Sequence, residues 1–235
     1  MKQISETTFT SDNGMITFIH GDCMEFMAGC KENEFDLAVV DPPYGLSYDS
    51  DAKRKAGYKG KNQAVKRKDY INSNFDKDCP NSEYFTTLLN LSKNQIIFGA
   101  NHFISKLAIN SSCWIVWDKD NGDNDFADCE LAWTSFRSAV RKFTWRWQGM
   151  LQQNMKHKQE RIHVTEKPIQ LYRWIFKNYA KSTDHVLDTH GGSMSSAIAA
   201  HMEGLRMTII ELDDEYFTKA INRFSIYEQQ QTIKF

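Results

Sequence analysis

The C-terminal third of the chain carries the clearest alternation of hydrophobic and polar positions. Apolar residues at helical spacing predict a helix over 168–180, which begins with Pro168, a residue favoured at the first helical position. Four further elements follow: a strand at 185–188, a small-residue helix that ends at Gly204, a strand at 206–211 and a helix at 214–224. Strands and helices that alternate at this spacing predict a βαβ unit in a parallel sheet.

The first two thirds of the chain contain shorter patterns, most of which predict strands. A short helix is expected at 23–30, and a longer one at 82–92 with Ser82 as its N-cap. Apolar runs predict strands at 15–20, 35–40, 95–99, 112–118, 129–136 and 142–148. The stretch from Gly45 to about Asn74 has no sustained apolar periodicity, which is typical of a functional or disordered segment.

The composition is that of a folded protein with one large domain. The chain has 235 residues, of which 41% are hydrophobic and 13% aromatic. It shows neither a signal-peptide pattern nor an apolar run long enough to span a bilayer. The five cysteines are odd in number and form no CxxC pair, so we expect reduced thiols in a cytoplasmic protein and no metal site.

Positive charge gathers in two segments although the formal net charge is −1. Residues 53–68 contain eight Lys or Arg and no acid. Residues 136–148 interleave aromatic side chains with four basic ones, Arg137, Arg141, Lys142 and Arg146. Local positive charge in a nearly neutral protein indicates a defined anionic partner. A solvated loop is the alternative interpretation of each segment.

The tetrapeptide Asp41-Pro42-Pro43-Tyr44 follows directly after the apolar run at 35–40. Proline donates no ladder hydrogen bond, so the two prolines end the strand and stiffen the residues around them. A carboxylate, free carbonyl groups and an aromatic ring are therefore held in one place. This arrangement suits a flat substrate that forms hydrogen bonds, although a simple turn is the alternative.

A second candidate site lies in the C-terminal third, where Gly191 and Gly192 connect a strand to a helix. Such a loop lets backbone N–H groups approach a ligand closely. Glu211 ends the next strand, 23 residues after Asp188, close to the offset at which an acid meets ribose hydroxyl groups. The loop lacks both GxGxxG and a phosphate-binding lysine, so it favours a nucleoside without pyrophosphate. The glycines could instead simply terminate the strand.

Taken together, the DPPY motif, the Glu166-Lys167-Pro168 segment and the glycine loop resemble the S-adenosylmethionine-dependent DNA amino-methyltransferases. The order of these motifs resembles the circularly permuted group in which the catalytic half comes first, and phage and bacterial adenine-N6 members are the most similar. The resemblance implies an α/β Rossmann-like fold with a mixed, mostly parallel seven-stranded sheet and helices on both faces. It implies one methyltransferase domain over 1–235, with a catalytic half at about 15–147, a cofactor half at about 161–225 and a basic DNA-contact insertion at 49–75.

The resemblance also assigns roles to residues. In the catalytic motif, Asp41 and the Pro42 carbonyl would accept hydrogen bonds from the target amino group, Pro43 would stiffen the loop, and Tyr44 would stack on a flipped base. S-adenosylmethionine would be bound by Asp22, Lys167, Pro168, Asp188, Gly191, Gly192, Ser193 and Glu211. DNA would be contacted by Lys53, Arg54, Lys66, Arg67, Lys68 and Arg146.

Three departures from the family pattern bear on these roles. Met194 replaces the small residue that usually follows the Gly-Ser pair, and we expect its long side chain to crowd the cofactor. Thr189 replaces the usual proline after the loop acid. Only residues 148–163 stand where larger relatives have a target-recognition domain, so recognition falls to the basic 49–75 segment.

Several alternatives remain beside adenine-N6 methylation of DNA, which would fit a role in restriction–modification. Cytosine-N4 enzymes share the chemistry but more often carry Ser in place of Asp41. Glutamine methyltransferases have an N-P-P-Y motif and the unpermuted order, which disfavours them. An RNA substrate stays open, as does a decayed module that binds DNA or a partner. The aromatic content is compatible with a homodimer, whereas no feature indicates a membrane or a partner endonuclease.

Overall fold

The computed structural model describes residues 1–46, 78–107, 110–122, 127–148, 151–163 and 165–231. Its strands are β1 (Lys2–Gln3), β2 (Thr8–Thr10), β3 (Ile16–His20), β4 (Phe35–Val40), β5 (Ser92–Phe98), β6 (Trp114–Asp118), β7 (Cys129–Thr134), β8 (Arg141–Thr144), β9 (Trp147–Gln148), β10 (Leu151–Gln152), β11 (His185–Asp188) and β12 (Arg206–Glu211). The helices are α1 (Cys23–Ala28), α3 (Ser82–Leu91), α4 (Ile104–Leu107), α5 (Ile169–Tyr179), α6 (Ser195–Glu203) and α7 (Asp214–Gln231), with a 3-10 turn, η2, at Ala100–His102.

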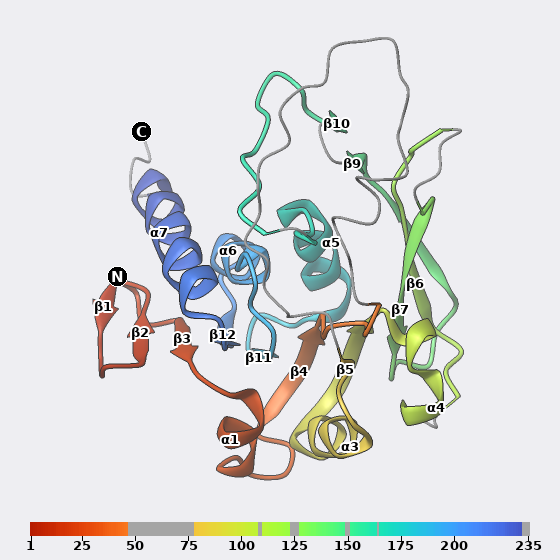
Figure 1. Ribbon diagram of the computed structural model, residues 1–235, viewed down its shortest axis with the longest axis horizontal. Helices are drawn as coiled ribbons and strands as arrows, with labels where there is room; N and C mark the ends of the chain where they lie inside the picture. Colours follow the sequence, from red (N-terminus) through yellow and green to blue (C-terminus); the bar gives the residue numbers. More distant parts are fainter. Residues whose placement is uncertain (47–77, 108–109, 123–126, 149–150, 164, 232–235) are drawn as a thin grey trace.

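One large mixed sheet organises the molecule (Figure 1). Its ten strands have the order β1-β2-β3-β12-β11-β4-β5-β7-β6-β8. The strands from β3 to β5 in this order are all parallel, and β7 runs antiparallel to both β5 and β6. The seven strands from β3 to β6 correspond to the expected mixed, mostly parallel sheet. The β1–β2 pair and β8 extend this sheet at its two edges.

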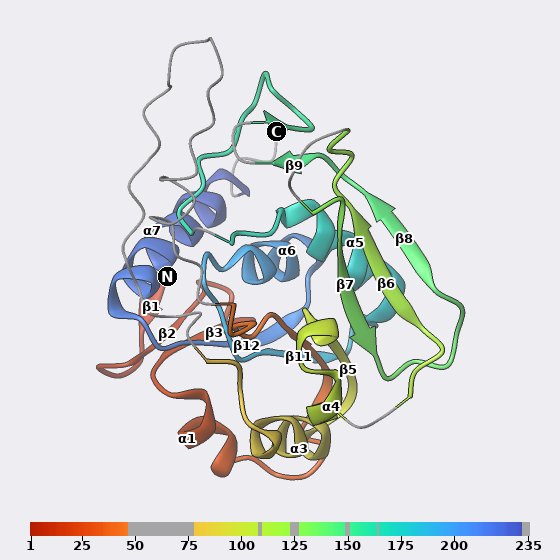
Figure 2. The same cartoon turned by 45° about the vertical axis from the view of Figure 1, so that its right-hand side comes forward.

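Helices cover both faces of the sheet, with α1 and α3 on one side and α5, α6 and α7 on the other (Figures 1 and 2). The central strand β4 shows how the sequence encodes this arrangement. Leu37 and Val39 belong to the hydrophobic cluster beneath α5–α7, whereas Ala38 and Val40 belong to the cluster beneath α1 and α3. A strand buried on both faces reads as a continuous apolar run instead of an alternating one.

The structure corrects three local predictions. The N-cap of α3 is Asn81, whose Oδ1 accepts a hydrogen bond from the Tyr84 N–H at 3.0 Å, so the expected cap at Ser82 is wrong. Pro168 occupies the N-cap position of α5 and not its first helical position. The strand expected over 142–148 divides in two, because β9 leaves the large sheet and pairs with β10.

A topological switch point lies between β4 and β11, which are neighbours in the sheet. From β4 the chain passes through α3 to β5 on one side, and from β11 it passes through α6 to β12 on the other. Open α/β sheets bind ligands in the crevice at the carboxyl ends of such strands. Asp41 follows β4, Asp188 ends β11 and Glu211 ends β12, so the fold brings the two candidate sites to one edge. No helix among the described residues is long and apolar enough to cross a bilayer.

Candidate active site

The DPPY loop forms a compact unit at the end of β4. The Tyr44 hydroxyl donates a hydrogen bond to Asp41 Oδ1 at 2.8 Å. The Tyr44 ring stacks on the imidazole of His102, with 5.0 Å between the ring centroids. Gly99 lies against the same ring with φ +68°, and a Cβ at this position would overlap the tyrosine ring atoms. Gly99 is therefore required both by its left-handed backbone conformation and by the position of Tyr44.

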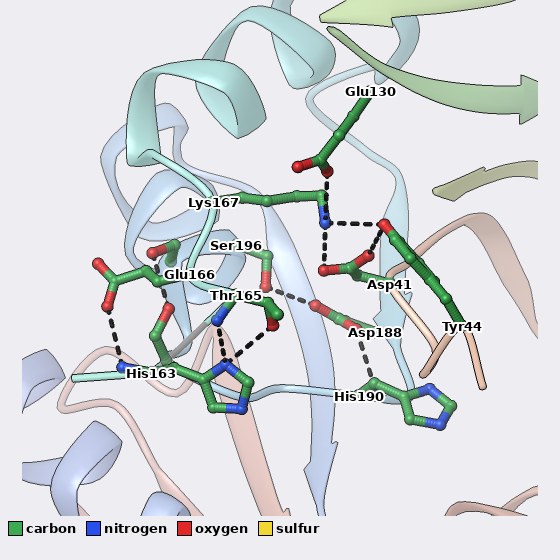
Figure 3. A network of polar contacts seen from close by, with 12 residues as sticks. Asp41, Tyr44, Glu130, His163, Thr165, Glu166, Lys167, Asp188, His190 and Ser196 are labelled. Carbon is green, nitrogen blue, oxygen red and sulfur yellow. Dashed lines mark hydrogen bonds and ion pairs between the residues drawn. The ribbon is translucent and has the colours of Figure 1, made fainter. Parts of the chain in front are cut away.

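Lys167 reaches the DPPY loop from the segment before α5 (Figure 3). Its Nζ forms an ion pair with Asp41 Oδ2, lies 3.2 Å from Tyr44 Oη and lies 3.2 Å from Glu130 Oε2. Glu130 belongs to β7, and its other oxygen accepts a hydrogen bond from Lys119 Nζ at 2.5 Å. Four charges of alternating sign therefore meet at the carboxyl edge of the sheet.

Burial and pairing act in opposite directions on these groups. Burial raises the pKa of Asp41 above its ordinary value, and the charge of Lys167 only partly offsets this effect. For Glu130, the two lysines outweigh burial and lower the pKa of the carboxyl group. For Lys167, the two carboxylates outweigh burial and raise the pKa of the ammonium group, which therefore stays charged. Lys167 therefore stays protonated, and Asp41 is easier to protonate than Glu130.

Asp188 connects the two ends of the glycine loop between β11 and α6 by hydrogen bonds. Its carboxylate accepts hydrogen bonds from the His190 N–H at 3.0 Å and from the Ser196 hydroxyl at 2.6 Å. The Gly191 N–H donates to the carbonyl of Ile210 at 2.7 Å, so the loop backbone lies directly on β12. Burial raises the pKa of Asp188 to about 7, although both hydrogen bonds oppose the shift.

Glu211 connects the glycine loop to the next turn of the chain. Its carboxylate accepts hydrogen bonds from the Gly192 N–H at 2.6 Å and from the Asp213 N–H at 2.9 Å. The backbone carbonyl of Glu211 accepts a hydrogen bond from Gly21, so Asp22 begins α1 beside it. Asp22 accepts hydrogen bonds from the N–H groups of Met24 and Glu25 and thus serves as the N-cap of α1. A helix cap was one of the two roles open for this residue, and contact with a cofactor stays a prediction.

Arg223 of α7 supports the same loop from behind. Its guanidinium donates to the carbonyl of Ser193 at 2.9 Å and pairs with Glu166 Oε1 at 2.9 Å. The Glu166 side chain is completely buried, and its other oxygen accepts a hydrogen bond from the Ile162 N–H. The two side chains thereby join α7, the glycine loop and the Glu166-Lys167-Pro168 segment.

Met194 does not line the loop as we expected. The residue has φ +54° at the start of α6, and its side chain is fully buried in the hydrophobic cluster beneath α5–α7. The left-handed backbone conformation turns the long side chain into the core. The expected crowding of a ligand by Met194 is therefore not found.

The remaining predicted residues lie elsewhere. Arg146 follows β8 and pairs with the side chain of Asp120, and it donates from Nε to the Asp120 carbonyl at 3.1 Å. The other five predicted DNA contacts, Lys53, Arg54, Lys66, Arg67 and Lys68, lie outside the described residues. Sequence reasoning missed Glu130 and Arg223 as members of the site. A signal existed for Glu130, because it is the one acid in the otherwise uncharged segment 129–136.

The acidic side chains at the carboxyl edge of the sheet suit a cationic nucleoside. Asp22, Asp188 and Glu211 gather three acidic groups around the glycine loop, and carboxylates accept hydrogen bonds from ribose hydroxyl groups. The cation that supports the loop, Arg223, is paired with Glu166 and so does not face it as a phosphate ligand would. S-adenosylmethionine carries ribose hydroxyls, a sulfonium and an ammonium group and no phosphate, so the residues fit it. Among the described residues no group of three His, Cys, Asp or Glu side chains could hold a metal ion.

Comparisons with known proteins agree with this architecture. A family model described as DNA methylase, N6_N4_Mtase, matches residues 55–222. The structure of M1.HpyAVI with S-adenosylmethionine is 20% identical with a TM-score of 0.56, over 89% of this chain and 98% of that chain. TTHA0409 from Thermus thermophilus, complexed with S-adenosyl-L-methionine, is 16% identical with a TM-score of 0.55, over 90% and 95%. The cytosine-N4-specific PvuII DNA methyltransferase is 11% identical with a TM-score of 0.58, over 97% and 96%. These similarities confirm the Rossmann-like methyltransferase fold.

Proposed function

Because the chain belongs to the DNA methylase family N6_N4_Mtase, we propose that it transfers a methyl group from S-adenosylmethionine to the N6 amino group of an adenine in DNA. The observation that carries the proposal is the position of Asp41. Its carboxylate lies at the switch point between β4 and β11, next to the loop whose acids suit the cofactor. In this proposal the base and the cofactor would meet at one edge of the sheet, which supports transfer between them.

The DPPY loop would activate the target amino group. An exocyclic amino group is a poor nucleophile because its lone pair is delocalised into the ring. Hydrogen bonds from its two N–H groups to the Asp41 carboxylate and the Pro42 carbonyl would localise that pair on nitrogen. The carboxylate would also stabilise the positive charge that develops on nitrogen, while Tyr44 would stack on the flipped base. After methyl transfer the nitrogen would release one proton to solvent, which leaves neutral N6-methyladenine. Positioning of the nitrogen for direct in-line attack supplies the rest of the rate.

The glycine loop and its acids would hold the cofactor. S-adenosylmethionine supplies a methyl group made electrophilic by its sulfonium, which leaves as a neutral thioether. Glu211 would accept hydrogen bonds from the ribose hydroxyl groups, and Asp22 would lie near the adenine of the cofactor. Asp188, Gly191 and Ser193 would line the methionine side, with their backbone geometry maintained by Arg223 and by the β12 backbone.

Adenine is preferred over cytosine because the chain has Asp41 where cytosine-N4 enzymes more often have Ser. The cytosine-N4 alternative retains support from the fold, since PvuII is one of the similar structures. The basic segment at 49–75 and Arg146 would contact DNA phosphates, which position a protein on the duplex without reading sequence. This division predicts that base choice depends on the DPPY loop and DNA affinity on the basic segment.

Nucleoside mass spectrometry tests the proposal directly. Unmethylated DNA is incubated with the protein and isotope-labelled S-adenosylmethionine, beside an Asp41→Ala variant, and is then digested to nucleosides. Labelled N6-methyladenine is expected with the wild type and not with the variant. Calorimetry should show that Asp41→Ala keeps its cofactor affinity within a few-fold, because Asp41 serves the base. Labelled N4-methylcytosine would move the assignment to the other base, and absence of any labelled base would overturn the proposal.

A further inference from the structure

We infer that Lys167 is a positioning residue for the catalytic carboxylate: it orients Asp41 and keeps it ionised. Glu130 reduces the effect of the Lys167 charge on Asp41. The inference rests on the proposed function, in which Asp41 must accept a hydrogen bond from the target amino group. It changes the role that the family resemblance gives to Lys167, from a ligand of the cofactor to a partner of the base-binding loop.

Lys167 is held by three contacts at the base-binding loop and β7. An ammonium group has three N–H donors and accepts no hydrogen bond. Lys167 Nζ donates hydrogen bonds to Asp41 Oδ2 and, at 3.2 Å, to Tyr44 Oη, and it forms an ion pair with Glu130 Oε2 at 3.2 Å. The Lys167 side chain is only 3% exposed, and a turn toward the glycine loop would leave Asp41 without its ion-pair partner. The hydrogen bonds and ion pairs of Lys167 are therefore made to the base-binding loop and to Glu130.

The Asp41 carboxylate can still accept hydrogen bonds from the target base. Asp41 Oδ2 faces Lys167, and Oδ1 accepts the Tyr44 hydroxyl at 2.8 Å. Each carboxylate oxygen has two lone pairs, so both retain one acceptor position. The contacts from two directions fix the plane of the carboxylate, which determines where the remaining lone pairs point. The lysine thus orients an acceptor without consuming it.

Glu130 connects this pair to the neighbouring strands. It lies opposite Trp117 in the β6–β7 pairing, and Lys119 just beyond β6 binds its second oxygen at 2.5 Å. The row Lys119, Glu130, Lys167 and Asp41 alternates in sign. The negative charge of Glu130 also interacts with Lys167, so it partly cancels the electrostatic effect of Lys167 on the Asp41 carboxylate.

The two neighbours should therefore act on Asp41 in opposite directions. Groups facing Asp41 come from β7, β11, α3, α5, the segment before α5 and its own loop, namely Glu130, Asp188, Tyr84, Tyr172, Lys167 and Tyr44. Lys167 is the cation of this set. Loss of its charge makes protonation of Asp41 easier, and loss of the Glu130 charge makes protonation harder. A residue that only supported the fold would produce no such opposed pair of shifts.

The pH dependence of methyl transfer to unmethylated DNA, with labelled S-adenosylmethionine, tests these signs. The acid limb should move to higher pH by about one to three units in Lys167→Met, and to lower pH in Glu130→Gln. Lys93→Met is the matched control, since Lys93 forms an exposed ion pair with Asp36 away from the site, and its acid limb should match that of the wild type. Cofactor affinity, measured by calorimetry, should stay within a few-fold in all three variants. Unmoved acid limbs in the first two, or a large loss of cofactor affinity in Lys167→Met, would overturn the inference.

A second measurement needs no substrate. The carboxyl resonance of Asp41 is assigned by carbon-13 NMR of aspartate-labelled protein, as the signal lost in Asp41→Asn, and is titrated in each variant. The same opposed shifts are expected, and Glu130→Gln, which is isosteric, tests the sign alone should Lys167→Met fail to fold. If the wild type transfers no methyl group but the resonance shifts as expected, the proposed function fails and the role of Lys167 stands. If methyl transfer occurs but the resonance does not shift, only the role of Lys167 fails.

Discussion

Replacement of Gly99 by alanine should damage the active site through a single added carbon atom. Gly99 follows β5 with φ +68°, and an added Cβ would overlap the ring of Tyr44. The left-handed conformation alone costs a non-glycine residue about 1–2 kcal/mol. Forcing an extra carbon into a packed site costs roughly 1–3 kcal/mol more. We therefore expect Gly99→Ala to lower the free energy of unfolding by about 2–5 kcal/mol.

The chain offers a control that separates these two costs. Gly14 has φ +73° in the turn between β2 and β3, and a Cβ there would meet no atom within 4 Å. Gly14→Ala should therefore cost only the conformational part, about 1–2 kcal/mol. The difference between the two variants, measured by urea denaturation, isolates the clash with the ring. In the double variant Gly99→Ala/Tyr44→Ala the clash is absent, so its loss of stability should be smaller than the sum of the two single losses.

The functional consequence follows from what Gly99 touches. Displacement of the Tyr44 ring should strongly reduce methyl transfer, because the ring stacks on the target base in the proposed mechanism. Cofactor affinity should remain within a few-fold, since the contacts of Gly99 are with the base-binding loop. Radiolabelled methyl transfer and calorimetry measure the two effects. Equal destabilisation by Gly99→Ala and Gly14→Ala, together with unchanged methyl transfer in both, would refute the reasoning.

Two further predictions concern the cofactor loop. The pKa of Asp188 is raised from its ordinary value of 3.8 to about 7 in the folded protein, so this group stabilises the fold at low pH and loses that contribution as pH rises from about 4 to 7. Asp188→Asn should therefore be more stable than the wild type at pH 8, by up to the order of 4 kcal/mol, and equally stable near pH 4. The free energy of unfolding is measured by urea denaturation across this pH range. A constant difference between the two proteins would contradict the prediction. Arg223→Met leaves the buried Glu166 carboxylate unpaired and the Ser193 carbonyl without its donor, so we expect a loss of about 3–5 kcal/mol and weaker cofactor binding. Added Glu166→Gln should restore most of the stability but not the cofactor affinity measured by calorimetry, and a double variant as unstable as Arg223→Met would speak against the ion pair as the cause.

Much of the fold could be predicted because its signals are local. Residues 35–40 form a continuous apolar run, since the central strand β4 is buried on both faces, and the prolines that follow end it at Asp41. The same holds for β11, α6 and β12, whose order and spacing correspond to the predicted βαβ unit. Short edge strands such as β1 and β2 escaped prediction. Two or three residues carry no detectable period. The pairing of β2 with β3, and of β1 with β2, is what makes them strands.

The sequence by itself therefore determined the order of the longer strands and helices and the positions of Asp41, Asp188 and Glu211 at strand ends. It did so because hydrophobic period and proline placement act on neighbouring residues. Only the tertiary structure decided which side chains meet. Lys167 binds a carboxylate 126 positions away, Arg223 supports a carbonyl 30 positions away, and Met194 turns into the core. Such contacts depend on how segments distant in the chain pack against one another, and no local pattern of residues encodes that packing.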